Sequence, residues 1–178
     1  DSPTVSASSS NYCVPNPIDA YPSAFTFSNA NLRVTFNSGT WRTCLGSIKV
    51  DTGKWYWECK FTSVSGAGGY STGVGSEVIT TSSNPTAATG ACVYEGIAGL
   101  IYKDGVSSSA GATATTGDII GIAFDASAKT MAVYKNGTLL TTVTSLTGTT
   151  FAPIFADSAL GAAYSDINFG QQPFTYTP

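Results

Sequence analysis

The fold is decided by KWYWECKFT, residues 54–62, in which large apolar side chains recur at every second position. A period of two is that of an extended strand, whose successive side chains point to opposite faces. The face predicted to pack inward consists of Trp55, Trp57, Cys59 and Phe61. The opposite face, predicted to be half-solvated, holds Tyr56, Glu58 and Lys60. A strand that buries two tryptophans on one face requires a second layer of structure to cover it.

Short apolar segments of the same kind recur along the chain between turn residues, and no window repeats its apolar residues with helical spacing. Two turns, Asp104-Gly105 and Asn136-Gly137, are pairs that best tolerate the two positive φ angles of a type I′ hairpin. The chain is therefore predicted to be all-β, a two-sheet antiparallel β-sandwich. The predicted strands are 24–28, 32–36, 45–50, 54–62, 72–77, 95–102, 118–125, 130–135, 138–143, 151–156 and 162–169.

Length and charge set the domain count and exclude two classes of partner. A chain of 178 residues suffices for one hydrophobic core, so residues 11–178 are predicted to form a single domain. Residues 1–10, DSPTVSASSS, have the composition of a flexible leader or linker. With 8 lysines and arginines against 11 aspartates and glutamates, no basic patch is available to bind nucleic acid. The longest purely apolar stretch, 119–124, is too short for membrane insertion.

The sequence predicts no catalytic residue, no metal site and no cofactor. It contains no histidine, which removes the commonest general base and the commonest metal ligand. GYSTG at 69–73 matches the nucleophile elbow of α/β-hydrolases, but that motif needs a histidine and a following helix. DTG at 51–53 matches aspartic proteases, which need a second aspartate across a pseudo-twofold axis. Both motifs are interpreted as turns or loops.

Four cysteines are predicted to act mainly as small core side chains. Their spacing contains no C-x-x-C pair, and no histidine is present to complete a zinc site. Four cysteines permit three disulfide pairings, and the sequence does not choose among them. The residues are Cys13, Cys44, Cys59 and Cys92.

A series of motifs, taken in order and spacing, resembles the SPRY domain family. The resemblance spans about residues 13–176. The motifs are GKWYWE at 53–58, GVG at 73–75, GDIIGIAFD at 117–125, YKNG at 134–137 and NFGQQPF at 168–174. The last of these, together with NYCVPNP at 11–17, is most similar to SPRY variants appended to bacteriophage and prophage virion proteins. Where the family usually carries an S-W-G-Y-type strand, this chain has ACVYEG at 91–96.

The resemblance implies a bent β-sandwich of concanavalin-like jelly-roll topology that has no catalytic activity and binds a partner through loops at one rim. We therefore expect a non-enzymatic interaction module on a bacteriophage virion, in a tail-fibre, baseplate or head-decoration role, and hence an extracellular location. Its expected partner is a protein, either a virion subunit or a host-surface receptor. Two alternatives stay open: a lectin-like module that binds glycans on Tyr70 or Tyr94, and a structural domain that contacts only neighbouring virion subunits.

The predicted partner-binding residues lie in the loops that the resemblance places at that rim, 38–42, 65–70, 79–90 and 156–163. These loops consist mostly of small residues, so the few large side chains are the expected anchors, because aromatic residues and arginine dominate interface energetics. The anchors are Trp41, Arg42, Tyr70 and Phe155. The competing interpretation buries Trp41 under the early strands and pairs Arg42 with a carboxylate.

Overall fold

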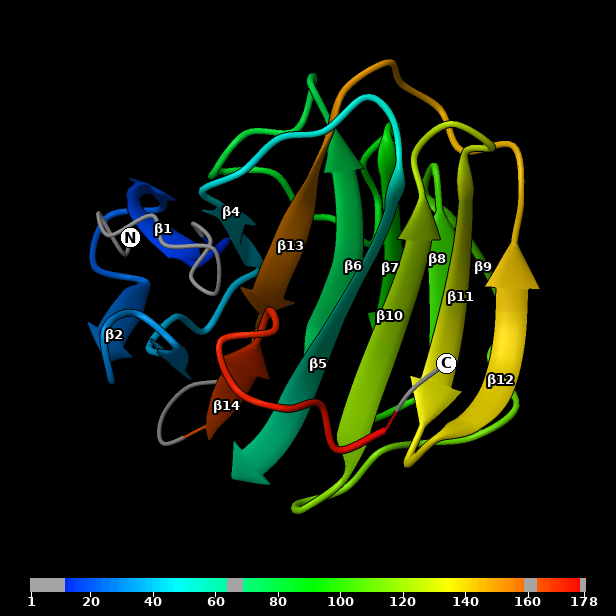
Figure 1. Ribbon diagram of the computed structural model, residues 1–178. Helices are drawn as coiled ribbons and strands as arrows, with labels where there is room; N and C mark the ends of the chain where they lie inside the picture. The colour runs from blue at the N-terminus through cyan, green and yellow to red at the C-terminus, as the bar shows by residue number, and fades with distance from the viewer. Residues whose placement is uncertain (1–11, 64–68, 159–162, 177–178) are drawn as a thin grey trace, which may run out of the picture.

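A computed structural model describes residues 12–63, 69–158 and 163–176, and within them the chain forms strands and no helix (Figure 1). The first sheet has the order β1-β4-β13-β6-β7-β8-β9 and the second β12-β11-β10-β5-β14-β3-β2. The strands are β1 Pro15–Ala20, β2 Phe25–Ser28, β3 Arg33–Phe36, β4 Arg42–Gly46, β5 Lys54–Ser63, β6 Ser71–Ser76, β7 Ala91–Glu95, β8 Leu100–Lys103, β9 Val106–Ser109, β10 Ile119–Asp125, β11 Thr130–Lys135, β12 Thr138–Val143, β13 Phe151–Asp157 and β14 Ala163–Asn168.

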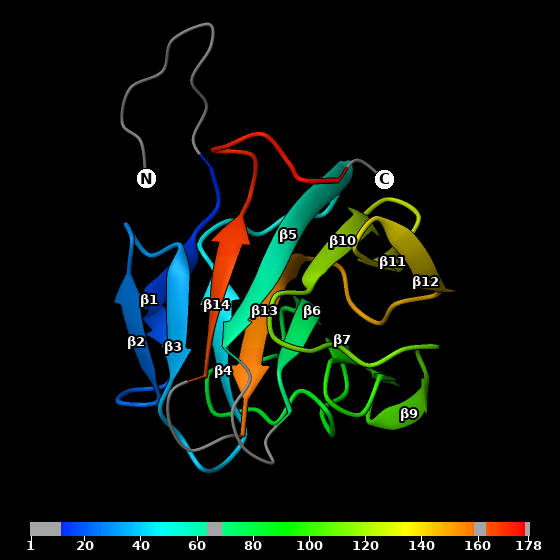
Figure 2. The same cartoon turned by 90° about the horizontal axis from the view of Figure 1, so that it is seen from below.

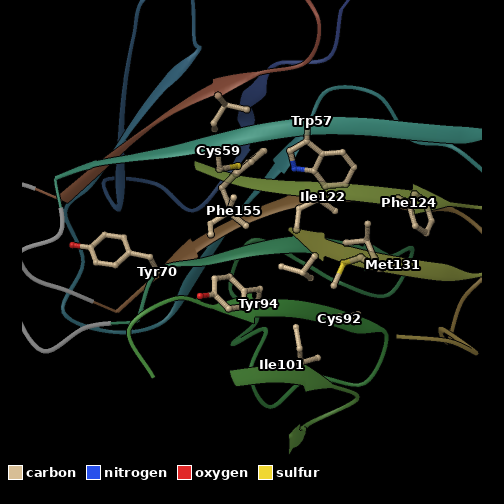
Figure 3. Packing of buried hydrophobic residues seen from close by; sticks show 14 of the residues in the cluster. Trp57, Cys59, Tyr70, Cys92, Tyr94, Ile101, Ile122, Phe124, Met131 and Phe155 are labelled. Carbon is tan, nitrogen blue, oxygen red and sulfur yellow. The ribbon is translucent and has the colours of Figure 1, made fainter. Parts of the chain in front are cut away.

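The two sheets stack face to face, which confirms the predicted antiparallel β-sandwich. Side chains from both layers meet between them: Trp57 and Ile122 from the second sheet face Tyr94 and Phe155 from the first (Figure 3). Each of these four side chains is at most 2% exposed. In the described part of the chain no helix is long and apolar enough to cross a membrane.

Both predicted hairpins are present. Asp104 and Gly105 join β8 to β9 with φ angles of 52° and 80°, and Asn136 and Gly137 join β11 to β12 with 49° and 80°. Two successive positive φ angles are what a type I′ turn requires, and they match the right-handed twist of the flanking strands. The Asn-Gly and Asp-Gly pairs therefore fix the register of both hairpins.

All four cysteines are free and buried, as predicted for small core side chains. Burial raises the pKa of the Cys59 and Cys92 thiols to about 12. It also raises the pKa of Cys13 and Cys44 above the ordinary value. All four sulfurs are therefore neutral thiols at physiological pH and contribute mainly through packing.

The predicted strands do not include β1 or β9, and they overlap β7 only at Glu95. β1 contains Pro15 and Pro17, which suit only an edge strand, and β1 does lie at the edge of the first sheet. The segment predicted as one strand, 95–102, is instead the end of β7, a turn and the start of β8. Gly96 and Gly99 lie in that turn, and they were the available signal for it.

The strand that decides the fold departs from its predicted faces at two positions. Trp57, Cys59 and Phe61 are buried as expected, but Trp55 is 45% exposed because it lies at the end of the sandwich, at the start of β5. Its indole Nε1 donates a hydrogen bond to the Thr52 carbonyl at 2.8 Å. On the supposedly solvated face, Glu58 is only 3% exposed.

Glu58 is covered by residues 169–176, here called the strap, which cross the outer face of β5 and β10 (Figures 1 and 2, red). The backbone N–H groups of Thr175 and Tyr176 donate to the two carboxylate oxygens of Glu58, at 2.9 and 2.7 Å. Phe174 packs edge-on against Tyr56, with ring centroids 4.8 Å apart. The strap thus covers a sheet face that alternation alone assigned to solvent.

Candidate functional site

Four strands of the first sheet bring parts of three predicted loops, 38–42, 65–70 and 156–163, together at one end of the sandwich. β4 begins at Arg42, which pairs in register with Asp157 at the end of β13. β6 begins at Ser71, which pairs with Glu95 at the end of β7. We call this end the Trp41 rim. Within the predicted loops, residues 65–68 and 159–162 lie outside the described residues.

Trp41 and Arg42, both half-buried, are held in place at this rim. The Arg42 guanidinium carbon lies 4.2 Å from the centroid of the Tyr21 ring, a cation–π contact. Arg42 Nη1 also donates to the Trp41 carbonyl at 2.8 Å. Arg42 therefore rests on a ring and a carbonyl rather than on the carboxylate that the competing interpretation gave it.

The Trp41 ring packs against the apolar cluster on the outer face of the first sheet, and both this ring and the Glu95 carboxylate lie close to Gly69. A Cβ on Gly69 would lie 2.8 Å from Trp41 Cη2 and 2.6 Å from Glu95 Oε1, so the close approach leaves no room for a side chain. Glu95 is 5% exposed and accepts the N–H groups of Ile97 and Ala98, both at 3.0 Å. Burial raises the pKa of Glu95 above its ordinary value, against the opposing effect of these two hydrogen bonds.

The other two predicted contact residues are core residues. Tyr70 and Phe155 are each 1% exposed. The Tyr70 ring packs against Phe36 and Phe61 at centroid distances of 6.0 and 5.8 Å. Because the structure places both predicted rings between the sheets, the expectation that they are exposed at the rim is wrong (Figure 3). Their large apolar rings were ambiguous in sequence, since the same residue types form cores and interfaces.

Burial also argues against the lectin-like alternative, in which sugars would stack on the rings of Tyr70 or Tyr94. Tyr94 is 0% exposed and its hydroxyl donates to the Ala112 carbonyl at 2.9 Å, while Tyr70 is as deeply buried. A stacking platform needs an exposed ring face, and neither tyrosine offers one.

The predicted rim loop 79–90 lies instead over the outer face of the first sheet. Thr43 bonds it twice: its N–H donates to the Thr81 carbonyl at 3.0 Å and its hydroxyl to the Ser83 carbonyl at 2.9 Å. Beneath the loop, Ile79 packs with buried side chains of the sheet such as Ile154. This loop is thus mainly a cover for a second apolar cluster.

Tyr21 is the rim residue that the sequence analysis missed. It follows β1 directly, and its contact with Arg42 depends on the pairing of β1 with β4. Since β1 was not predicted, no sequence signal placed Tyr21 near Arg42. Among the described residues, no group of three or more His, Cys, Asp or Glu side chains could hold a metal ion.

Comparison with known proteins addresses the fold and the family. The family model described as "SPRY domain" matches residues 54–172, well over half of the chain. This chain belongs to the SPRY domain family. SPRY domains are non-enzymatic protein-interaction modules. The match begins at Lys54, so Tyr21, Trp41 and Arg42 lie upstream of the segment that the family pattern covers.

Solved structures extend the fold match over most of the chain. The SPRY domain of human HERC1 has a TM-score of 0.75 and 21% identity, covering 89% of this chain and 99% of that one. The TRIM65 PSpry domain has a TM-score of 0.71 and 14% identity, covering 91% and 90%. At these identities the likeness shows the fold alone. None of the curated proteins compared with this chain matches it.

Proposed function

We propose that this SPRY domain is non-enzymatic and binds a protein partner through the Trp41 rim, with Trp41, Arg42 and Tyr21 as its contact residues. The observation that carries the proposal is the fixed position of Arg42, 4.2 Å above the Tyr21 ring and bonded to the Trp41 carbonyl. A side chain held in place before binding loses little conformational entropy on association. Tryptophan, tyrosine and arginine are also the residue types most enriched at binding hot spots.

The second part of the proposal concerns the particle to which the domain belongs. We propose that the domain belongs to a bacteriophage virion protein, in a tail-fibre, baseplate or head-decoration role, and is displayed outside the cell. The support for this is the similarity of NFGQQPF at 168–174 and NYCVPNP at 11–17 to virion-associated SPRY variants. The structural relatives named above support the family and do not bear on this context.

The rim is tested by site-specific photocrosslinking. A benzophenone amino acid at exposed Thr40, next to Trp41, should capture a partner from host-surface or particle extracts, whereas the same probe at exposed Val106 in β9 should not. Arg42→Ala and Trp41→Ala should each weaken binding of the captured partner by about 5- to 30-fold, equivalent to about 1–2 kcal/mol. Equal capture from both positions, or full affinity in both variants, would move the site away from this rim.

The virion context needs a separate test. Mass spectrometry of purified phage particles, prepared after prophage induction, should detect this chain as a stoichiometric component. A particle reconstruction then decides between the two forms of the proposal. A Trp41 rim that faces outward supports a receptor-binding role, and a rim buried between subunits supports the structural alternative. Absence of the chain from particles would remove the virion proposal and leave the protein-binding rim intact.

A further inference from the structure

The strand ends that pair at the Trp41 rim include three charged side chains, of which one is positive. Asp157 is 2% exposed and Glu95 is 5% exposed, so both carboxylates are withdrawn from the surface. Arg42 is only half-buried, at the start of β4. Among these strand-end residues, Arg42 is therefore the one whose charge a partner can reach.

Arg42 makes no ion pair within the part of the chain that the structure describes. Its cross-strand neighbour is Asp157, whose Oδ1 accepts the Ser158 N–H at 2.6 Å, whereas Arg42 Nη1 donates to the Trp41 carbonyl at 2.8 Å. The ion pairs formed in that part of the chain are Arg33–Asp166, Lys54–Asp125 and Lys135–Asp118. The guanidinium charge is thus not matched by a bonded carboxylate.

The sequence around the rim offers no other counter-ion. Segments 64–68 and 159–162, VSGAG and ALGA, contain no acidic residue. Segments 21–23 and 38–41, YPS and SGTW, include the two residues that Arg42 contacts and carry no charge either. A carboxylate for Arg42 would therefore have to come from another molecule.

The geometry of Arg42 is suited to receive one. The Tyr21 ring supports the guanidinium, with its carbon 4.2 Å from the ring centroid, so the group is held flat against this ring. Arg42 Nε is buried, which leaves the two Nη atoms as the donors for an end-on approach. Carboxylates bind guanidinium groups with two parallel hydrogen bonds, and this arrangement is specific because both groups are planar.

We propose that the partner bound at the Trp41 rim presents an aspartate or glutamate side chain that pairs end-on with Arg42. This inference rests on the function proposed for that rim and names the chemistry of its partner. The pair forms at a low cost in conformational entropy, because Tyr21 and the Trp41 carbonyl already hold the guanidinium. A basic partner segment is excluded from the same position by like-charge repulsion.

The test uses a displayed library of random peptides, selected on the full chain at low salt. Selected peptides are kept if they crosslink to a benzophenone amino acid at Thr40 but not at Val106. Each acidic residue of these peptides is then replaced by its amide. One replacement should weaken binding to the unchanged protein by at least about fivefold, and it should have no further effect on binding to Arg42→Gln. Raising the salt concentration should weaken binding to the unchanged protein more than binding to Arg42→Gln.

Two further variants separate this ion pair from a general effect of charge. Lys49→Gln removes a positive charge from an exposed residue beyond the other end of β4 and should leave peptide affinity unchanged. Arg42→Lys keeps the charge without the planar fork, so it should weaken binding, but less than Arg42→Gln does. If Arg42→Gln does not fold, the amide-substituted peptides and the salt titration still test the pair with the unchanged protein and Arg42→Lys.

Three results would overturn the inference and leave the Trp41 rim as the binding site. In the first, peptides crosslink at Thr40 but none depends on an acidic residue. In the second, the amide replacement weakens binding to Arg42→Gln as much as to the unchanged protein. In the third, Lys49→Gln weakens binding as much as Arg42→Gln. Selection of peptides that never crosslink at Thr40 would contradict the rim itself, and with it the inference.

Discussion

Removal of the Glu58 carboxylate should release the strap and destabilise the domain. Glu58 is 3% exposed, and its two oxygens accept the N–H groups of Thr175 and Tyr176 at 2.9 and 2.7 Å. The Tyr56 hydroxyl is a weaker third donor, at 3.4 Å. Because the strap has no strand of its own here, these contacts and the Phe174–Tyr56 ring pair are its main connection to β5.

The magnitude follows from the number and type of these bonds. A hydrogen bond to a charged acceptor contributes about 1.5–3 kcal/mol, so two contribute about 3–6 kcal/mol. Two effects reduce this: the variant no longer buries a charge, and the freed N–H groups can bond to water once the strap lifts. Glu58→Ala should therefore lower the free energy of unfolding by about 2–4 kcal/mol. Glu58→Gln retains one acceptor and should lose about half as much.

The assay combines urea unfolding with amide hydrogen exchange. Lys60→Ala is the matched control, because Lys60 lies on the same face of β5, two residues further on, and is exposed. It should cost less than about 0.5 kcal/mol. In Glu58→Ala the amides of Thr175 and Tyr176 should exchange at least about tenfold faster, as the loss of 1.4 kcal/mol of local stability implies.

The reasoning would be refuted if Glu58→Ala and Lys60→Ala had equal effects on stability while the Thr175 and Tyr176 amides remained protected. That outcome would mean that the strap is held by its apolar contacts alone. A loss of protection without any loss of global stability would instead show that the strap opens independently of the sandwich, which would refute only the predicted magnitude.

Three further predictions address the core, the thiols and the response to acid. Trp57→Ala should lower the free energy of unfolding by about 3–5 kcal/mol, whereas Trp55→Ala should lower it by less than about 1.5 kcal/mol; similar losses in urea titrations would contradict the assigned positions of the two rings. Because all four thiols are buried and the pKa of Cys59 and Cys92 is raised to about 12, a thiol reagent at pH 8 should label none of them in the folded protein and all four in guanidinium. Burial tends to raise the pKa of Asp118, but hydrogen bonds from Thr115, Asn136 and Lys135 outweigh it and lower the pKa to about 2, below the unfolded value. The ionised Asp118 side chain therefore stabilises the fold above about pH 4, and this stabilisation is lost as the pH falls towards 2. In acid titrations, Asp118→Asn should lose less stability over that interval than the unchanged protein does.

Local sequence rules predicted the parts of the fold that depend on short-range chemistry. The hairpin at Asn136-Gly137 was predictable because a type I′ turn needs two residues with positive φ, and asparagine followed by glycine adopts them most readily. Trp57, Cys59 and Phe61 face inward because the pleat of β5 fixes which side chains share a face. These outcomes need no knowledge of distant segments.

The errors arise where a distant segment or the end of a strand decides burial. The alternating pattern of β5 places Glu58 on the face predicted to be solvated, but the strap, more than 100 positions later in the chain, covers it. The same pattern places Trp55 on the face predicted to be buried, but Trp55 lies at the start of β5 and is half exposed. Tyr70 lies in a loop-like sequence and yet its ring reaches the core. Alternation identifies the faces of a strand and does not identify what covers them.

The same two coverings bear on where the proposed contact residues lie, at an end of the sandwich. The strap crosses the outer face of β5 and β10, and loop 79–90 bonds across the outer face of the first sheet at Thr43. With the middle of each outer face covered in this way, half-exposed aromatic side chains remain at the ends: Trp41 with Tyr21 at one, Trp55 at the other. The two ends differ in chemistry, because the Trp41 rim presents a guanidinium fixed against the Tyr21 ring, whereas the Trp55 end has a partly open cavity with an uncharged lining. A fixed cation beside half-buried aromatic side chains suits a protein surface, so we expect variants of Trp41 and Arg42 to change partner binding, and variants of Trp55 to leave it unchanged.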